Sequence, residues 1–313
     1  MTSIATPTAK PPRRRRGTKL QRRQTRLAWL LLTPALAVVA LVAIYPLGKT
    51  IFQSFTDQEF LALTPTKWVG LQNYRDLWHD TFFRHSIWVT VKFTIISVLF
   101  EFVLGLIIAL VVNSSFKGRG VMRAVMLVPW AIPTVVAAQM WKLMLDDTFG
   151  VVNDAGVRLH VISHSHAWIS DPSTALASVI AVDVWKTTPF VALLLLAGLQ
   201  NIDASLYEAA ATDGAGAGWQ LRHITLPLLK PAILVVLIFR TLDAFRVFDL
   251  IYVLSGGGPG TSTEPISLYA FNALLQNLEF GYGSALSVII FAVTLGLAVL
   301  YIKGLGADVE GAR

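Results

Sequence analysis

The stretch Glu208-Ala209-Ala210-Ala211-Thr212-Asp213-Gly214, followed after nine residues by Ile224-Thr225-Leu226-Pro227, decides how the chain folds. It is polar, rich in small residues, and lies between two long apolar runs. Connections between neighbouring helices usually take roughly 2–8 residues, whereas this one extends from Gln200 to Pro231. We therefore expect it to fold as a unit of its own or to have a function.

The residues of this connection predict a helix–turn–helix. Ser205 and Glu208 have the S-x-x-E spacing of a capping box, which would start a short helix. Asp213 and the three alternating glycines that follow it predict a turn at the end of that helix. A second short helix is predicted from Trp219 and should stop at Pro227, because proline lacks the backbone N–H that a helix interior uses.

The composition indicates a membrane protein. Hydrophobic residues make up 54% of the 313 residues and charged residues only 14%, which is far from the balance of a soluble domain. The apolar residues come in blocks long enough to cross a bilayer, which takes about 20 residues per helix. We predict an all-α polytopic membrane protein with six transmembrane helices at about 27–48, 86–112, 121–144, 174–199, 232–254 and 281–302. The chain has no cysteine, so thiol chemistry is excluded.

The lysines and arginines indicate the orientation. Residues 1–26 contain nine of them and no acidic residue, so this arm is predicted to be disordered and to favour anionic lipid. The side that holds the arm and the 200–231 connection has sixteen, against five on the other side. Because cytoplasmic loops carry the excess of positive charge, we predict a cell-membrane protein with both termini and this connection in the cytoplasm. The membrane domain is placed at 27–303 and a short cytoplasmic tail at 304–313.

The spaced pattern of the connection resembles the EAA loop of permeases of ATP-binding cassette (ABC) importers: Glu-Ala-Ala, three residues, Gly, nine residues, Ile-x-Leu-Pro. In that family the loop contains the coupling helix, which docks into a cleft on the cytoplasmic ATPase. The resemblance implies a type I importer (MetI-like) fold and contact with two ABC ATPase subunits through Glu208, Ala209, Ala210, Asp213, Gly214, Leu226 and Pro227. ATP hydrolysis would then belong to a partner chain, and this chain would have no catalytic residue, cofactor or metal. A solvated loop without a partner is the alternative for the Glu-Ala-Ala triplet alone.

Three further stretches resemble sugar-importer permeases. Val128-Pro129-Trp130-Ala131-Ile132-Pro133 resembles their third span, and Trp185-Lys186-Thr187-Thr188-Pro189-Phe190 resembles their fourth. Ser255-Gly256-Gly257-Gly258-Pro259-Gly260 resembles the outer turn that marks the first of two paralogous permeases, of the maltose/trehalose type. The resemblance implies a heterodimer with a second permease and an extracytoplasmic sugar-binding lipoprotein that delivers a trehalose- or maltose-like di- or oligosaccharide. It implies no nucleic-acid partner.

A sugar needs aromatic faces for its ring and polar groups for its hydroxyls. The resemblance places the sugar contacts on Trp130, Thr134, Asp183, Thr187, Phe190, Asp243 and Arg246, with the two aromatic residues as stacking surfaces. The maltose-type pattern has asparagines where this chain has Asp183, Asp243 and Arg246. We expect Asp243 and Arg246 to hold each other in place while presenting free edges to the sugar.

Charges inside the predicted spans leave other interpretations open. Ionisable groups at bilayer depth usually face a cavity or one another, and here they are Glu101, Asp183, Lys186, Arg240, Asp243, Arg246 and Asp249. A spacing of three brings Asp243 near both Arg240 and Arg246. A proton-coupled secondary sugar carrier would use Glu101, Asp183 or Asp243 as proton sites, although no internal repeat is evident. An intramembrane enzyme with paired carboxylates is a third interpretation, and a purely structural ion-pair ladder is the non-functional one.

Two other motifs predict no chemistry. No lysine follows the glycines at 256–258 in the way that a phosphate-binding loop requires, so a turn is expected there. His160, His164 and His166 have no carboxylate partner at a set spacing, so a solvated loop is expected rather than a metal site.

Overall fold

The computed structural model describes residues 19–59, 65–114 and 116–310, and these ranges are mostly helical. The part of the predicted disordered arm at 1–18 and the last residues of the predicted tail, 311–313, lie outside the described residues. Helix α1 (Lys19–Val39) begins inside the segment that the sequence assigned to the arm, so residues 19–26 are helical. It continues through a π-helical segment, η1 (Ala40–Ile44), into α2 (Tyr45–Gln53).

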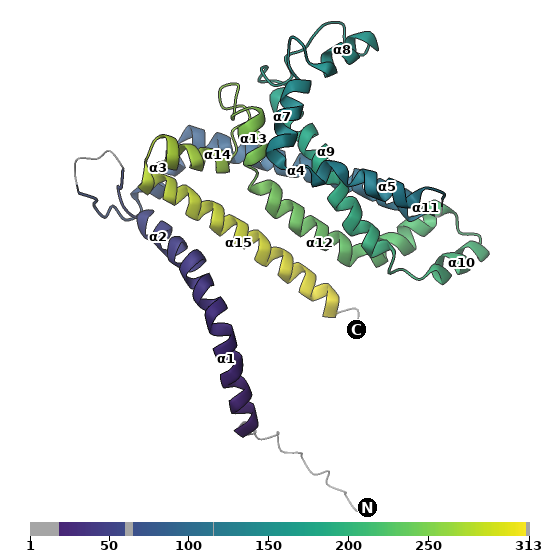
Figure 1. Cartoon of the computed structure of the whole chain (residues 1–313), viewed down its shortest axis with the longest axis horizontal. Helices are drawn as coiled ribbons and strands as arrows, with labels where there is room; N and C mark the ends of the chain where they lie inside the picture. The colour runs from purple at the N-terminus through teal and green to yellow at the C-terminus, as the bar shows by residue number, and fades with distance from the viewer. Residues whose placement is uncertain (1–18, 60–64, 115, 311–313) are drawn as a thin grey trace, which may run out of the picture. The chain divides into compact units, whose positions relative to one another are not determined.

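The described residues contain the spans that an all-α polytopic membrane protein requires, which confirms the predicted fold class. Five helices are long and apolar enough to cross a membrane: Arg23–Gln53, Thr81–Asn113, Ala175–Leu199, Ala217–Phe245 and Phe280–Gly304. A bent pair supplies a sixth span if its two halves are counted together. The long helices are α4 (Thr81–Asn113), α9 (Ala175–Leu199), α12 (Leu226–Phe245) and α15 (Phe280–Glu310), shown in Figure 1.

The third span, predicted at about 121–144, is this bent pair. Helices α5 (Arg119–Met126) and α6 (Val128–Ala131) form one half and α7 (Thr134–Met144) the other, with a bend of 89° between them. The bend has a local cause, because the residue before a proline is pushed out of the helical region. Ile132 precedes Pro133, and its ψ of 131° is extended.

The helical core of the compact unit Ile51–Arg313 is built on α4 and α9, which pack along each other, with α12 against both. Buried apolar side chains fill this contact: Ala109, Val112, Val191, Leu195, Leu196, Leu199, Leu229 and Val236. Glycines bring the helices close, as is common in membrane bundles. A Cβ on Gly105 of α4 would lie 2.5 Å from Val191 Cγ1 of α9, and one on Gly198 would lie 2.6 Å from Ala232 Cβ of α12.

A second group of helices closes the opposite end of α4. Helices α3 (Gln72–His79), α14 (Ile266–Phe271), η3 (Asn272–Gln276) and α15 share an apolar cluster with the start of α4. Asp80 caps α4 by accepting a hydrogen bond from the Phe82 N–H at 2.8 Å. Its other oxygen accepts from the hydroxyls of Tyr282, at 2.6 Å, and Tyr269. One carboxylate therefore ties α4, α14 and α15 together.

The predicted helix–turn–helix forms, but with two differences. Helix α10 (Ala204–Thr212) is capped by Asp203, whose side chain accepts from the Ser205 N–H at 2.9 Å, so the predicted Ser205–Glu208 capping box is wrong. The carboxylate of Asp203 is already in the N-cap position that satisfies the first free N–H groups. Figure 1 shows α10 projecting beyond the ends of α9 and α12.

The second difference concerns the proline that was expected to end a helix. The chain continues from α11 (Ala217–Gln220) through the π-helical segment η2 (Leu221–Thr225) directly into α12, so the fifth span begins before the predicted 232. Leu226 N–H bonds to Leu221 O in the wider π pattern. Pro227 follows as one of the first residues of α12, where a missing N–H is tolerated. The span ends at Phe245, and α13 (Asp249–Leu254) is a separate short helix.

We predict that Gly105→Val destabilises the fold by about 1–3 kcal/mol, because its side chain would force α4 away from α9. Gly296→Val is the matched control: this glycine is also in a long apolar helix, and a Cβ there meets nothing within 4 Å. The cost of leaving glycine within a helix is therefore similar in both variants. Thermal unfolding in detergent measures the difference, and equal unfolding temperatures would contradict the close α4–α9 contact.

Candidate functional site

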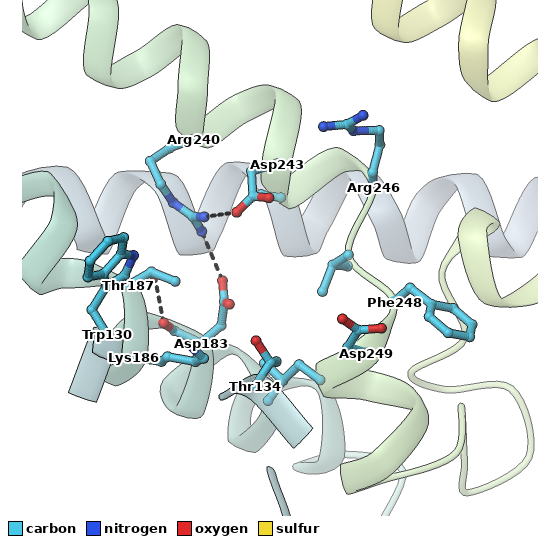
Figure 2. A pocket seen from close by; sticks show the side chains of 13 residues that line it. Trp130, Thr134, Asp183, Lys186, Thr187, Arg240, Asp243, Arg246, Phe248 and Asp249 are labelled. Atoms are coloured by element: carbon cyan, nitrogen blue, oxygen red, sulfur yellow. Dashed lines mark hydrogen bonds and ion pairs between the residues drawn. The ribbon is translucent and has the colours of Figure 1, made fainter. Parts of the chain in front are cut away.

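A cavity of about 410 Å³ opens beside the α4–α9–α12 core. Its walls come from the α6–α7 bend, α9, the end of α12 and the turn that leads into α13. Figure 2 shows its lining side chains: Trp130, Thr134, Asp183, Lys186, Thr187, Arg240, Asp243, Ala244, Arg246, Val247, Phe248, Asp249 and Leu250. Two spans are interrupted beside the cavity, one at the α6–α7 bend and one at residues 246–248 between α12 and α13. Residues in or next to each interruption line the cavity. Irregular backbone at membrane depth is tolerated where it lines a cavity.

Six of the seven residues expected to contact a sugar line this cavity, and the seventh, Phe190, lies behind one of them. The Phe190 ring stacks on Trp130 with 5.6 Å between ring centroids and 16° between planes. Trp130 is 46% exposed. One face of Trp130 is therefore covered by Phe190, and Trp130 is the aromatic ring of the pair that lines the cavity.

Arg240 of α12 is the centre of the charges at the cavity wall. Its Nε and Nη2 donate to the two oxygens of Glu101 at 2.5 and 2.7 Å, a bidentate contact with α4. Nη2 also donates to Asp183 Oδ2 of α9 at 3.1 Å, and Nη1 donates to Asp243 Oδ2 at 2.5 Å. Glu101 is fully buried and Arg240 is 3% exposed, whereas the Asp243 side chain is largely exposed. One guanidinium thus joins three spans and orients two carboxylates that line the cavity.

Thr187 strengthens this cluster from α9. Its hydroxyl oxygen lies 2.6 Å from Glu101 Oε1 and also 2.6 Å from the backbone carbonyl of Asp183. The buried carboxylate of Glu101 is therefore surrounded by a bidentate cation and a hydroxyl, which is the kind of compensation that buried charge requires.

The predicted pair between Asp243 and Arg246 does not form. Asp243 is held by Arg240, whereas Arg246 Nε donates to the backbone carbonyl of Leu242 at 3.1 Å. Figure 2 shows the Arg246 guanidinium turned away from Asp183 and Asp249. The reason is that α12 ends at Phe245, so Arg246 has φ −106° and ψ 20° and no longer follows the helical spacing that the prediction assumed.

Two members of the cluster, Glu101 and Arg240, were absent from the predicted sugar contacts. The sequence did mark both as ionisable residues inside apolar spans, which is a signal for a functional or paired group. The spacing of three also predicted the contact of Arg240 with Asp243, which forms, but it could not pair Arg240 with Glu101, because residues 101 and 240 lie 139 positions apart. Phe248 was missed for a different reason, since the predicted fifth span treated its turn as helix, while Asp249 was marked as an ionisable residue of that span but not as a sugar contact.

The second predicted site is the exposed end of the helix–turn–helix. Glu208 and Ala209 on α10 and Asp213, which directly follows it, are exposed, while Ala210 is buried. Gly214 ends the helix with φ +82°, and Leu226 and Pro227 form the start of α12. Tyr207 OH and Thr225 Oγ1, 3.0 Å apart, join α10 to η2.

The cap of α10 also has an electrostatic effect. The hydrogen bond from the Ser205 backbone N–H lowers the pKa of Asp203 below its usual value. The cap therefore stays charged at neutral pH, where it complements the positive end of the helix dipole. Among the described residues, no group of three or more His, Cys, Asp or Glu side chains is arranged to hold a metal ion.

The sequence is similar to known transport proteins. The family model described as binding-protein-dependent transport system inner membrane component matches residues 101–305. The trehalose/maltose transport system permease protein MalF of Thermococcus litoralis is 45% identical over 294 residues, covering 91% of this chain and 95% of that protein. The sulfoquinovosyl glycerol transport system permease protein SmoG of Agrobacterium fabrum is 40% identical, covering 88% and 89%. The trehalose transport system permease protein SugA of Mycobacterium tuberculosis is 38% identical, covering 99% and 98%.

Solved structures share the fold. A chain of a bacterial ABC transporter involved in the import of the acidic polysaccharide alginate superposes with a TM-score of 0.79 at 24% identity, covering 91% of this chain and 98% of that one. A second alginate ABC transporter structure, in complex with an alginate pentasaccharide-bound periplasmic protein, has the same TM-score at 22% identity, covering 90% of this chain and 94% of that one. These likenesses establish the architecture.

We predict that Arg240→Met unfolds or strongly destabilises the chain, by about 3–5 kcal/mol, because it leaves Glu101 buried without a cation. The double variant Glu101→Leu, Arg240→Met should recover part of this loss, since Glu101 is then no longer a stranded charge, although Asp183 still lacks its contact with Arg240. Chemical or thermal unfolding in detergent distinguishes the two. An Arg240→Met variant as stable as the parent would show that the guanidinium does not hold the three spans together.

Proposed function

The chain belongs to the family of binding-protein-dependent transport system inner membrane components, as a permease subunit of a sugar ABC transporter, and we propose that the cavity beside Arg240 is its part of the sugar path. The permease is a transport component rather than an enzyme. The secondary-carrier and intramembrane-enzyme interpretations are set aside, because family membership assigns the driving reaction to an ATPase.

The observation that supports the sugar path is the composition of the cavity wall. It combines the Trp130 ring with the hydroxyls of Thr134 and Thr187 and the carboxylates of Asp183 and Asp243. Aromatic faces and convergent polar groups are what a sugar requires, and 410 Å³ lies within the roughly 300–1,000 Å³ of small-molecule sites. The relatives named for trehalose and maltose transport favour a trehalose- or maltose-like di- or oligosaccharide as the substrate.

The carboxylates suit this role because each keeps a free oxygen. Arg240 occupies Oδ2 of Asp183 and Oδ2 of Asp243, and no hydrogen bond is formed by the other oxygen of either side chain among the described residues. A carboxylate accepts stronger hydrogen bonds than the asparagine that the maltose-type pattern has at these positions. Asp183, Asp243 and Trp130 are therefore the sugar contacts that we propose first, with Thr134, Thr187, Phe190 and Arg246 around them.

The second part of the proposal concerns the partners. We propose that α10 and the turn after it dock on a cytoplasmic ATPase through Glu208, Ala209 and Asp213, whose side chains are exposed. A homologous second permease would complete the path, and an extracytoplasmic binding protein would deliver the sugar. The excess of sixteen over five basic residues supports a cytoplasmic position for α10 and both termini.

We predict that Trp130→Ala and Asp243→Asn each lower the uptake of trehalose or maltose about tenfold or more, because the first removes the stacking surface and the second replaces a charged acceptor by a weaker neutral one. Uptake and sugar-stimulated ATPase activity are measured in the assembled importer, with the wild-type rate for these two sugars as the baseline. Leu143→Ala is the control, since Leu143 is 62% exposed on α7 and does not line the cavity. Wild-type rates in both cavity variants, or no wild-type uptake of either sugar, would refute the proposed path and substrate class.

For the coupling helix, we predict that Gly214→Val abolishes transport and permease-stimulated ATP hydrolysis while the protein still inserts in the membrane. A valine cannot easily adopt the φ of +82° at this turn, although the space around it is open. Gly218→Val is the matched control, because a Cβ on Gly218 also meets nothing within 4 Å and its φ is not positive. Co-purification with the ATPase reports docking directly. If Gly214→Val and Gly218→Val support transport and ATP hydrolysis equally well, the positive φ at Gly214 has no role in coupling.

A further inference from the structure

Lys186 is a buried cation for which the ion-pair cluster provides no partner. It is 8% exposed, lies on α9 one turn after Asp183, and lines the cavity. Among the described residues, its ammonium group forms no hydrogen bond and no ion pair. Burying an unpaired charge is costly, so such a residue needs a reason to be there. Figure 2 shows it beside Asp183 at the cavity wall.

The hydrogen-bond donors of the cavity show what Lys186 adds. Arg240 uses its Nε, Nη1 and Nη2 on three carboxylates, and Arg246 is turned away toward its own backbone. The Thr187 hydroxyl lies against Glu101 and the Asp183 carbonyl. The wall is therefore rich in acceptors, through Asp183, Asp243 and Asp249, whereas its buried charged donor without a protein partner among the described lining residues is the Lys186 ammonium; the Arg246 guanidinium is exposed and turned away.

A sugar presents both kinds of partner. Each hydroxyl donates one hydrogen bond and accepts others, and the ring and glycosidic oxygens only accept. Carboxylates can bind hydroxyl protons but leave every acceptor oxygen unsatisfied. A sugar that enters this cavity needs a donor on the same wall, and an ammonium group with three N–H bonds supplies it.

We propose that Lys186 binds the transported sugar, donating hydrogen bonds to its acceptor oxygens while Asp183 and Asp243 accept from its hydroxyls. This inference rests on the proposed function of the cavity and extends it by one specificity-determining residue. A sugar hydroxyl that lies between a carboxylate and the ammonium donates to the first and accepts from the second, and each hydrogen bond strengthens the other. The cavity should therefore prefer a sugar with a hydroxyl at that position over a sugar without it.

The proposal predicts opposite effects on stability and transport. Methionine has a similar length and no charge, so Lys186→Met removes a buried unpaired charge and fills its space. The unfolding temperature of the purified importer should stay the same or rise. Uptake of trehalose or maltose should fall about tenfold or more, because charged hydrogen bonds to the sugar are lost. Lys186→Gln, which keeps a neutral donor, should retain more activity than Lys186→Met.

The experiment uses the complete importer, with its ATPase, second permease and binding protein, reconstituted in liposomes. Uptake and sugar-stimulated ATPase activity are measured beside thermal unfolding for the parent, Lys186→Met and Lys186→Gln. Lower uptake at unchanged or higher unfolding temperature supports the proposal. Unchanged uptake overturns it, and so does a fall in unfolding temperature that accounts for the lost uptake, since Lys186 would then be structural.

Two comparisons separate this inference from the function on which it rests. If Trp130→Ala and Asp243→Asn lower uptake while Lys186→Met does not, the path is correct and the role of Lys186 is wrong. If all three variants transport at the wild-type rate, the proposed sugar path and the proposed role of Lys186 are both wrong. Deoxy and deoxyfluoro sugars add a direct test, because fluorine accepts weakly but cannot donate. The parent should favour fluorine over hydrogen at the contacted position, and Lys186→Met should lose that preference.

Discussion

The bidentate contact between Arg240 and Glu101 is the constraint on which the rest of the structure depends. A carboxylate with no exposure inside an apolar span is tolerable only when a cation and further donors surround it. Arg240 meets that need from α12, at 2.5 and 2.7 Å, and so fixes α12 against α4. The remaining N–H bonds of the same group reach Asp183 and Asp243. The interaction that holds three spans together thus also positions two carboxylates in the cavity.

The cavity exists because two spans are interrupted beside this cluster. Ile132 and Pro133 break the span formed by α5, α6 and α7, and residues 246–248 separate α12 from α13. A bilayer cannot satisfy the backbone groups that such breaks expose, so they occur where protein or a hydrated cavity receives them. Both breaks border the same 410 Å³ space.

Sequence alone predicted what the bilayer or local chain chemistry dictates. Apolar block length located the spans, and the EAA pattern located the connection that folds as α10 and η2. It failed where tertiary packing decides the outcome. The Asp243–Arg246 pair was wrong because the end of α12 could not be located, and the end of the fifth span was misplaced for the same reason. The Ser205–Glu208 capping box was wrong because Asp203, two residues before Ser205, caps α10 instead, and the S-x-x-E pattern takes no account of that residue. The partner of Glu101 lies 139 residues away, beyond any spacing rule.

The position of α10 connects the two proposed sites mechanically. It lies between α9 and α12, and the cavity residues Lys186 and Arg240 sit about 20 Å along those helices by the helical rise. Along α12 alone the two distances are similar, but α11 and η2 continue α12 back to Ala217, so the helix that joins α10 to Arg240 is longer than the one that joins it to Lys186. A displacement of α10 that separated α9 from α12 would first stretch Arg240–Asp183, at 3.1 Å the longest contact of the guanidinium. The shorter contacts with Glu101 would keep α12 on α4, whereas the contact with Asp243 lies within α12. Thr187 also ties α9 to Glu101 at 2.6 Å, so separation at the cavity would have to break this contact as well before the wall that holds Asp183 and Lys186 could move.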